Sequence, residues 1–374
     1  MKIGILLYPT YGGSGVVATE LGMKLAQLEH QVHFITYRQP FRLDPLMENI
    51  YYHEVRISDY PLFEYPPYEL VLTSKIVDVA LYEKLDLLHV HYAIPHASAA
   101  YMAKQILKTK GTYLPVITTL HGTDITLLGK DESFEPVITF AINQSDEVTA
   151  VSYDLKEETC QYFDIQKNIK VIYNFVDIRN LPDSPYINEK EKILIHVSNF
   201  RKLKRVEDVI KVFDIVRKKI PSKLYLVGDG PERNKVEKLC RKLNACNSIK
   251  FFGKVKNVET LLHQSDVFLI PSAHESFGLA ALEAMASFVP VVSSNAGGLK
   301  EINQNGVSGF LCNVKDIECM ANRVVELLSD NDKLLQFKIN ARKQAEKFDV
   351  TKILPQYLEL YEETLKSATG KTLL

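Results

Sequence analysis

The chain has 374 residues, of which 46% are hydrophobic and 24% charged, a composition typical of a globular protein and a length suited to two domains. The net charge is −1, and the basic residues form no stripe interleaved with aromatic ones, which argues against a nucleic-acid-binding protein. No stretch approaches 18 continuous apolar residues, so we expect no membrane-spanning helix and no integral membrane association.

The five cysteines form no C-x-x-C motif. We therefore expect all five to be reduced thiols and the protein to be cytoplasmic. The first half of the chain is net acidic and the second half net basic. This division favours a polyanionic ligand such as a diphosphate in the second half, although ordinary surface variation would also account for it. The sequence leaves the oligomeric state open, a homo-oligomer included.

Short apolar segments alternate with helical patterns along the first part of the chain. The first segment, 2–7, is followed by a glycine loop and a helical pattern over 16–29. Further segments of the same kind lie at 32–36, 87–90, 116–120 and 148–151. This alternation predicts parallel strands joined by crossover helices.

A second alternating series begins after the stretch 174–192, which is rich in turn-forming and charged residues and is expected to be a linker. Its apolar segments are 193–197, 224–227, 249–252, 267–270 and 289–292. We therefore predict an α/β protein with two doubly wound Rossmann-like domains facing a cleft. The domains are expected at 1–170 and 190–348, with a last helix over 349–366 that packs back on the first.

The glycine loop after the first strand fits a G-x-G-x-x-A pattern through Gly13, Gly15 and Ala18. A dinucleotide site of this kind also needs an acid at the end of the second strand, but residues 36–38 are Thr, Tyr and Arg. We therefore favour a helix N-terminus that touches a phosphate or carboxylate. A tight turn without a ligand stays open as the alternative.

Histidines gather at two predicted strand ends of the first domain. His89, His91 and His96 lie in HVHYAIPH, where no nearby acid completes a set of metal ligands, so we expect histidines of the core or the cleft. His121 directly follows another strand, beside Thr123 and Asp124. We prefer a polar contact of His121 to a sugar or acceptor, with a structural role as the alternative.

The stretch 271–301 reads as a strand, a loop, a helix of small residues, a second strand and a glycine pair. Gly278 stands where that helix begins, and a helix start presents unpaired N–H groups that suit a phosphate. Glu275 and Glu283 flank this helix start, and a carboxylate can accept two hydroxyl hydrogen bonds. Together these features predict a nucleotide-sugar site.

Four cations follow the first strand of the second domain: Arg201, Lys202, Lys204 and Arg205. At a strand end they predict a diphosphate-binding cluster led by Lys204 and Arg201, while a solvated helix start is the alternative. The D-x-D at 330–332 is better explained by a helix N-cap than by a metal site. We therefore expect no metal and no other cofactor, so side chains and helix termini must meet the leaving-group charge.

The segment ESFGLAALE (275–283) resembles the E-x7-E motif of family-4 retaining glycosyltransferases, which have the GT-B fold. GGSG at 12–15, VIYNFVD at 171–177, VGDGPE at 227–232 and NAGGLKE at 295–301 extend the resemblance over nearly the whole chain. Within this family, HYAIPHA, TLHGTDIT and SNFRKLKRVEDVI are most similar to members that begin bacillithiol biosynthesis. The resemblance implies transfer of N-acetylglucosamine from UDP-GlcNAc to the hydroxyl of L-malate.

The resemblance also implies roles for residues at matching positions. Glu283 would hold the ribose hydroxyls, Glu275 would face the donor sugar, and Lys204 would neutralise the diphosphate. Many family members have Gly-Arg where this chain has Ser198-Asn199, so we assign the missing charge to Arg201 as a hypothesis. The expected catalytic residues are Glu275, His121, Arg201 and Lys204, and the expected donor-binding residues are Gly13, Ser14, Asn199, Arg201, Lys204, Glu275, Phe277, Gly278, Leu279 and Glu283.

The acceptor-binding residues are inferred from position at the strand ends: Ser14, Gly15, Tyr92, Thr123, Arg42 and Arg205. Asp124 is a poor candidate for a nucleophile, so we expect a front-face reaction in which the departing β-phosphate takes the acceptor's proton. Three alternatives stay open: a family-4 enzyme with another small or lipid acceptor, a UDP-sugar epimerase of GT-B type, and a non-catalytic nucleotide-binding or NAD-dependent protein.

Overall fold

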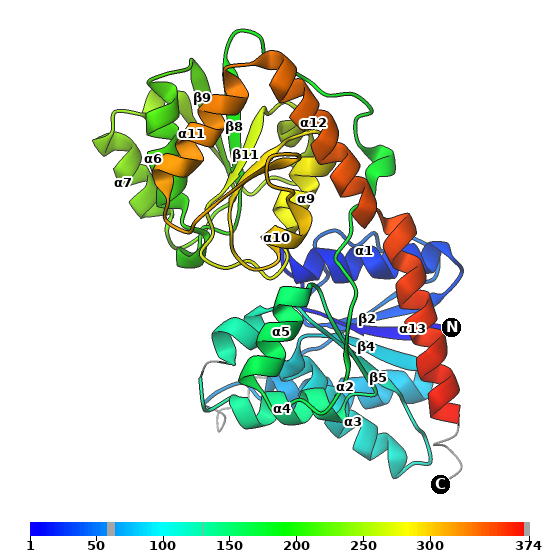
Figure 1. The fold of residues 1–374 in the computed structure, drawn as a ribbon. Helices are drawn as coiled ribbons and strands as arrows, with labels where there is room; N and C mark the ends of the chain where they lie inside the picture. The colour runs from blue at the N-terminus through cyan, green and yellow to red at the C-terminus, as the bar shows by residue number, and fades with distance from the viewer. Residues whose placement is uncertain (58–63, 130, 370–374) are drawn as a thin grey trace. The chain divides into compact units, whose positions relative to one another are not determined.

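The computed structural model describes residues 1–57, 64–129 and 131–369 (Figure 1). The chain forms two compact units. The N-terminal unit comprises Met1–Tyr173 together with the chain from Ile353 onward, and the C-terminal unit comprises Asn174–Lys352. Each unit contains one sheet of parallel strands.

The sheet of the N-terminal unit has seven strands in the order β3-β2-β1-β4-β5-β6-β7. The strands are β1 (Lys2–Leu6), β2 (Gln31–Thr36), β3 (Ile50–Glu54), β4 (Leu87–His91), β5 (Val116–Leu120), β6 (Glu147–Ala150) and β7 (Ile169–Val171). Helices α1 (Ser14–Gln27), α2 (Tyr68–Glu83), α3 (Ser98–Lys108), α4 (Glu135–Gln144) and α5 (Tyr153–Tyr162) connect them. The strand order reverses between β1 and β4, the place where open α/β sheets bind ligands.

Both faces of this sheet are covered by helices, which explains its nearly continuous apolar strands. Leu6 and Val90 pack with α2 and α3 on one face. On the other face, Phe34 lies against Gly22 of α1. The C-terminal helix α13 (Val350–Thr369) also reaches this face, where the Tyr361 hydroxyl lies 2.7 Å from Nδ1 of His89.

The sheet of the C-terminal unit has six strands in the order β10-β9-β8-β11-β12-β13, which reverses between β8 and β11. The strands are β8 (Lys192–Val197), β9 (Ser222–Val227), β10 (Ile249–Gly253), β11 (Val267–Ile270), β12 (Val291–Ser294) and β13 (Gly309–Cys312). The helices are α6 (Val206–Arg217), α7 (Arg233–Lys242), α8 (Glu259–His263), α9 (Leu279–Ala286), α10 (Leu299–Ile302), α11 (Ile317–Leu328) and α12 (Asn331–Ala345).

The prediction of two doubly wound α/β sheets is confirmed. Three strands were missed, namely β3, β7 and β13, and each lies at the edge of its sheet. The predicted N-cap in the D-x-D segment is also confirmed, because the Asp330 carboxylate accepts hydrogen bonds from the amides of Asp332 and Lys333 at the start of α12.

The prediction that all five cysteines are reduced is wrong for two of them. Cys312 at the end of β13 and Cys319 in the first turn of α11 form a disulfide. A short connection brings the strand end and the helix start together, so a spacing without a C-x-x-C motif still allows pairing. Cys160, Cys240 and Cys246 are free thiols.

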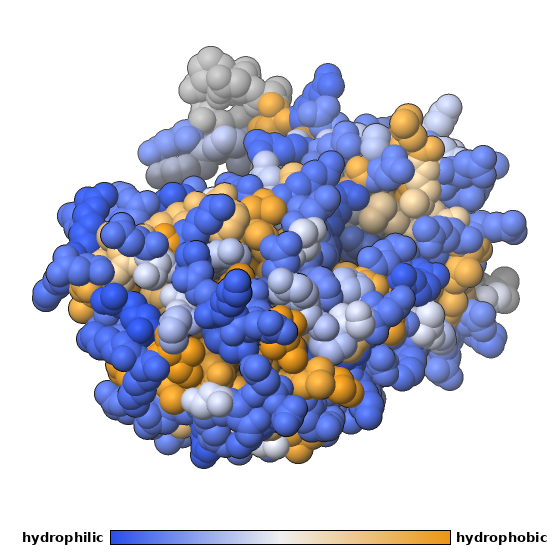
Figure 2. Space-filling view, turned by 90° about the horizontal axis from the view of Figure 1, so that it is seen from above, coloured by the Kyte–Doolittle hydropathy of each residue, from blue (hydrophilic) through white to orange (hydrophobic). Residues whose placement is uncertain are grey.

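The surface seen in Figure 2 is mostly hydrophilic, with apolar side chains in small separate groups. None of the described helices is long and apolar enough to cross a membrane.

Candidate functional site

In the C-terminal unit, the loops that follow β8 and β11 meet at the point where the strand order reverses. The amide of Ala273 donates a hydrogen bond to the carbonyl of Leu203 at 2.8 Å, which joins the two loops. A Cβ atom at Gly297 would lie 1.9 Å from the carbonyl oxygen of Glu275. The glycine pair after β12 therefore allows that loop to pack directly against the backbone at Glu275.

Lys204 and Glu275 form an ion pair between these two loops. Nζ of Lys204 lies 2.6 Å from Oε1 of Glu275, and the Ser272 hydroxyl donates to the same oxygen at 2.8 Å. The Glu275 residue is only 8% exposed. The structure thus brings together two residues predicted from separate segments and fixes the carboxylate with a serine that the sequence reading had missed.

His196 supports the same loop from within β8 and was also missed. Its Nδ1 lies 2.7 Å from the carbonyl oxygen of Leu269, and its Nε2 lies 2.8 Å from the hydroxyl of Ser198. Burial lowers the pKa of His196 to about 4, so the ring is neutral at pH 7. A histidine inside an otherwise apolar strand was the signal in the sequence.

The start of α9 follows a glycine in the left-handed region. Gly278 is its N-cap with a φ of +95°, and no side chain of the described residues caps the helix. Phe277 is 2% exposed and packs against Phe348 with ring centroids 5.9 Å apart. Its side chain therefore belongs to the core, which leaves its backbone as the group that can meet a ligand. Leu279 and Glu283 follow in the helix and are partly exposed.

The remaining cations of the predicted cluster differ in their surroundings. Arg201 and Lys202 are exposed, as is the neighbouring Asn199. Arg205 is partly buried and pairs with Asp208 in the first turn of α6, where its Nε lies 2.6 Å from the carboxylate. The charge of Arg205 is thus already partly neutralised by a residue of its own helix.

Two glycines of VGDGPE bring the loop after β9 against the loop after β8. A Cβ at Gly228 would lie 1.8 Å from the carbonyl oxygen of Ser198, and one at Gly230 would lie 2.0 Å from that of Asn199. Side chains at either position would push the two loops apart. These glycines therefore shape the backbone on which Asn199 and the cations stand.

In the N-terminal unit, the loops after β1 and β4 meet at the corresponding reversal of strand order. The hydroxyls of Ser14 and Tyr92 lie 2.7 Å apart and share a hydrogen bond. Gly13 is the N-cap of α1 with a φ of +62°. A Cβ at Gly15 would lie 2.5 Å from the carbonyl oxygen of Tyr8, so glycine is required for this close turn.

Asp124 joins the loops that follow β4 and β5. It is fully buried and accepts hydrogen bonds from the amides of Ala93 at 2.9 Å and Gly122 at 3.0 Å. Burial raises the pKa of Asp124 to about 6. Thr123 beside it is partly exposed. Asp124 was predicted from the sequence only as a poor nucleophile, and this structural role was missed.

His121 is 9% exposed, and its Nε2 lies 2.8 Å from Nδ1 of His91. Burial lowers the pKa of His121 to about 3, so the ring is neutral at pH 7 and acts through hydrogen bonds. Arg42 lies 3.4 Å from the carboxylate of Glu20 in α1. Both residues keep their proposed roles as predictions that the geometry of the free protein does not test.

Two family models match the chain. Residues 11–180 match "Glycosyltransferase Family 4" and residues 177–344 match "Glycosyl transferases group 1". The chain belongs to these families and is a glycosyltransferase with the GT-B fold. A curated relative from Bacillus anthracis, the N-acetyl-alpha-D-glucosaminyl L-malate synthase, is 47% identical over 98% of each chain.

Solved structures share the fold at low sequence identity. Sucrose-phosphate synthase from Thermosynechococcus elongatus has a TM-score of 0.81 and 19% identity, covering 98% of this chain and 100% of its own. Anabaena Alr3699/HepE in complex with UDP and glucose has a TM-score of 0.80 and 22% identity, covering 97% and 99%. These likenesses support the fold alone.

Proposed function

We propose that the protein transfers N-acetylglucosamine from UDP-GlcNAc to the hydroxyl of L-malate with retention of the α configuration, the first step of bacillithiol biosynthesis. The observation that carries this proposal is the 47% identity, over 98% of both chains, to the relative that is named for this product. In this proposal residues 190–348 bind the donor and residues 1–170 bind the acceptor.

On the donor side, Glu283 accepts hydrogen bonds from the ribose hydroxyls, and the start of α9 receives the diphosphate. The backbone amides near Phe277, Gly278 and Leu279 supply the donors of that helix terminus. The ion pair between Lys204 and Glu275 supports this assignment, because it joins the loop that carries the cations to the loop that is expected to hold the sugar. Asn199 and Arg201 border the same site.

On the acceptor side, the two carboxylates of malate need cations, hydroxyls or amides. Ser14 and Tyr92 offer two hydroxyls that already lie 2.7 Å apart, and the start of α1 at Gly15 offers amides and a favourable dipole. Thr123 adds a further hydroxyl. Arg42 and Arg205 would have to share their charge with Glu20 and Asp208, their partners in the free protein.

The proposed reaction proceeds on one face of the sugar. The bond from the anomeric carbon to the UDP oxygen breaks, the bond to the malate oxygen forms on the same face, and a β-phosphate oxygen takes the malate proton. The burial of Asp124 and its two amide hydrogen bonds support a route without a protein nucleophile. Lys204, Arg201, neutral His121 and the helix dipole of α9 then carry the charge stabilisation, without a metal.

Turnover of UDP-GlcNAc over a panel of acceptors tests the proposal. We expect UDP release that depends on L-malate and is much slower with D-malate, inositol phosphate or lipid phosphates, with an α-linked product by NMR. If another acceptor gave equal turnover, L-malate would no longer be the proposed acceptor and that compound would take its place. Epimerised UDP-sugar without any acceptor would instead identify an epimerase.

The cytoplasmic location and the assembly state stay predictions of this proposal. Three free cysteines support a reducing compartment, whereas the disulfide of Cys312 and Cys319 removes part of the argument that led to it.

A further inference from the structure

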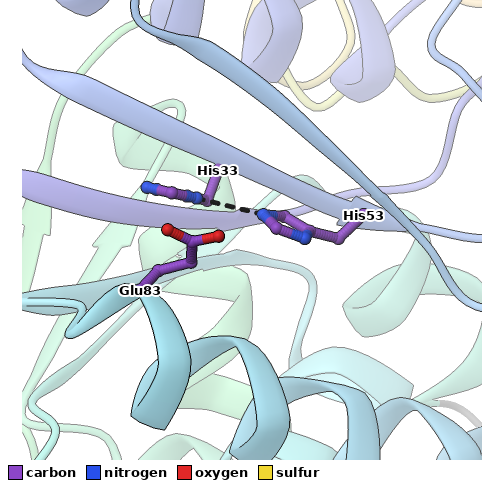
Figure 3. Close-up of side chains that lie close together, drawn as sticks. All are labelled: His33, His53 and Glu83. Carbon is purple, nitrogen blue, oxygen red and sulfur yellow. Dashed lines mark hydrogen bonds between the residues drawn. The ribbon is translucent and has the colours of Figure 1, made fainter.

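Two histidines and a glutamate converge in the N-terminal unit, at the β3 edge of its sheet (Figure 3). His33 belongs to β2, His53 to β3, and Glu83 is the last residue of α2. Each side chain offers one potential ligand atom, and the three atoms lie within 4.8 Å of one another. None of the three residues belongs to the donor or acceptor sites proposed above.

The register of the sheet explains why these side chains meet. His33 pairs with Tyr51 and Ile35 pairs with His53, so the two histidines are two positions apart on neighbouring strands. Side chains two positions apart point to the same face of a sheet. Ile35 packs with α2 on that face, and the end of α2 brings Glu83 to the histidines.

The distance between the rings fits a metal site. Nδ1 of His33 and Nε2 of His53 lie 3.0 Å apart and share a hydrogen bond. Nitrogens bound to a tetrahedral zinc ion at about 2.0–2.1 Å are about 3.3 Å apart. A shift of a few tenths of an ångström would therefore let an ion replace the shared hydrogen.

Only one of the two ring nitrogens of the buried His33 has a hydrogen-bond partner among the described residues. The residue is fully buried, and its Nε2 has no hydrogen-bond partner among the described residues. An ion bound by Nδ1 would leave the ring proton on Nε2, so this unpartnered nitrogen is a separate feature and the geometry at Nδ1 carries the argument for the ion. His53 and Glu83 are partly exposed, which gives an ion access and leaves room for a water ligand.

The charges around the cluster are also suited to a cation. No lysine or arginine of the described residues forms an ion pair with the Glu83 carboxylate, and the amine of Lys2 donates instead to the Glu83 carbonyl at 2.9 Å. Burial, followed by the neighbouring His53 and Lys2, lowers the pKa of His33 to about 4. Burial also lowers the pKa of His53, against the opposing effect of Glu83. Both rings are therefore neutral near pH 7, the form that binds metals.

We propose that His33, His53 and Glu83 bind one divalent transition metal ion, zinc in preference to magnesium or calcium. Two imidazoles and one carboxylate are a ligand set that suits zinc, while magnesium and calcium favour oxygen ligands. The ion would cross-link the edge strand β3 to β2 and to the end of α2. Its role is structural, because its ligands are separate from the residues assigned to the transfer reaction.

Zinc binding to tag-free, chelator-treated full-length protein tests this site. Calorimetry and metal analysis should give one zinc ion per chain and a higher melting temperature with zinc, with no comparable effect of magnesium. His53→Ala and Glu83→Gln should each lose at least tenfold in zinc affinity, and absorption bands of bound Co²⁺ should weaken in both. The glutamine variant keeps the size of the side chain, so it remains informative if the alanine variant folds poorly.

Two control variants separate this cluster from other zinc ligands. Sγ of Cys240 lies 2.7 Å from Sγ of Cys246, so a thiol pair in the C-terminal unit is the main competitor. His263, the last residue of α8, is a histidine of the C-terminal unit outside the cluster. Cys246→Ser and His263→Asn should each leave the one-zinc stoichiometry and affinity unchanged. Unchanged zinc affinity in both His53→Ala and Glu83→Gln, or loss of the bound zinc in Cys246→Ser, would overturn the proposal. Absence of zinc binding by the unaltered protein would overturn it as well.

Discussion

Lys204 and Glu275 neutralise each other between two loops, and this pairing changes what a substitution at either position would do. The Glu275 side chain is 9% exposed and is held by Ser272 as well as by the lysine. Removal of Lys204 would therefore take away a cation and also leave a nearly buried carboxylate without its partner. Both effects disfavour a diphosphate at this place.

We expect Lys204→Met to weaken UDP binding by about 1.5–3 kcal/mol, the usual contribution of a hydrogen bond to a charged group. Lys202→Met is the matched control, because Lys202 is an exposed cation of the same cluster. Its effect should stay within about 0.5 kcal/mol. Titration calorimetry with UDP measures both variants. Equal losses of UDP affinity in the two variants would mean that the cluster acts through its overall positive charge and that Lys204 makes no specific contact with UDP.

The sequence predicted both members of this pair but not their contact. Lys204 and Glu275 are 71 residues apart, and they meet because β8 and β11 are neighbours in the sheet. That order depends on packing between elements and leaves no local pattern in the chain. Ser272 and His196 were missed for a related reason, since their importance lies in what they hold in place.

At the scale of elements, the central strands were predictable and three of the four edge strands were not, β10 being the edge strand that was predicted. Central strands such as β4 and β5 are fully buried, so they appear as apolar runs. β3 is partly exposed along its whole length and β7 has only three residues, so neither carries a clear pattern. The missed edge strand β3 is also where His53 lies, and the metal-ligand cluster was therefore invisible in the sequence.

The start of α9 allows a prediction about a single element. Gly278 has a φ of +95°, and a Cβ there would lie 2.7 Å from the Leu299 side chain of α10. A left-handed conformation costs an alanine about 1–2 kcal/mol. Because the new Cβ would also meet Leu299, Gly278→Ala should destabilise the C-terminal unit by more than this cost. The same substitution should weaken UDP binding. Thermal unfolding and UDP calorimetry measure the two effects.

Gly306→Ala separates backbone strain from the steric contact. Gly306 has a φ of +75°, and a Cβ there would meet nothing within 4 Å. This variant should lose only the stability due to strain and should bind UDP normally. If both alanine variants lose the same stability and keep UDP affinity, the packing of Gly278 against α10 does not position the helix start.

At the scale of the whole molecule, the two units differ in how they bury titratable groups. The N-terminal unit buries a network of histidines: His89 lies 2.7 Å from both Tyr361 and Thr119, and His91 contacts His121. The C-terminal unit buries His196 near its site. The HVHYAIPH segment predicted that histidines would gather, but it could not show that Tyr357 and Tyr361 of α13, which returns from the end of the chain, would pack against His89.

These histidines should make the N-terminal unit sensitive to acid. Burial lowers the pKa of His89 and His121 to about 3 and of His96 to about 4, and places that of His91 well below its usual value. The unfolded chain then binds more protons than the folded one below about pH 6.5, so stability falls as the pH drops through this window. Asp124 acts in the opposite direction, because its pKa of about 6 makes the folded state bind a proton first.

With His33, whose pKa burial also lowers to about 4, five buried histidines stand against one carboxyl and should leave a net loss of stability in the N-terminal unit between pH 6.5 and 4. The C-terminal unit has His196, with a pKa lowered to about 4, and should lose less. Hydrogen exchange measured by mass spectrometry at pH 7 and pH 5, corrected for the intrinsic exchange rate, assigns the change to each unit. Asp124→Asn should steepen the loss, since it removes the opposing group. Its single side-chain oxygen can accept from only one of the amides of Ala93 and Gly122, so this variant should also be less stable than the unaltered protein at both pH values. Equal protection of the N-terminal unit at both pH values would show that the histidines keep their burial when protonated, and the acid sensitivity would have to be abandoned.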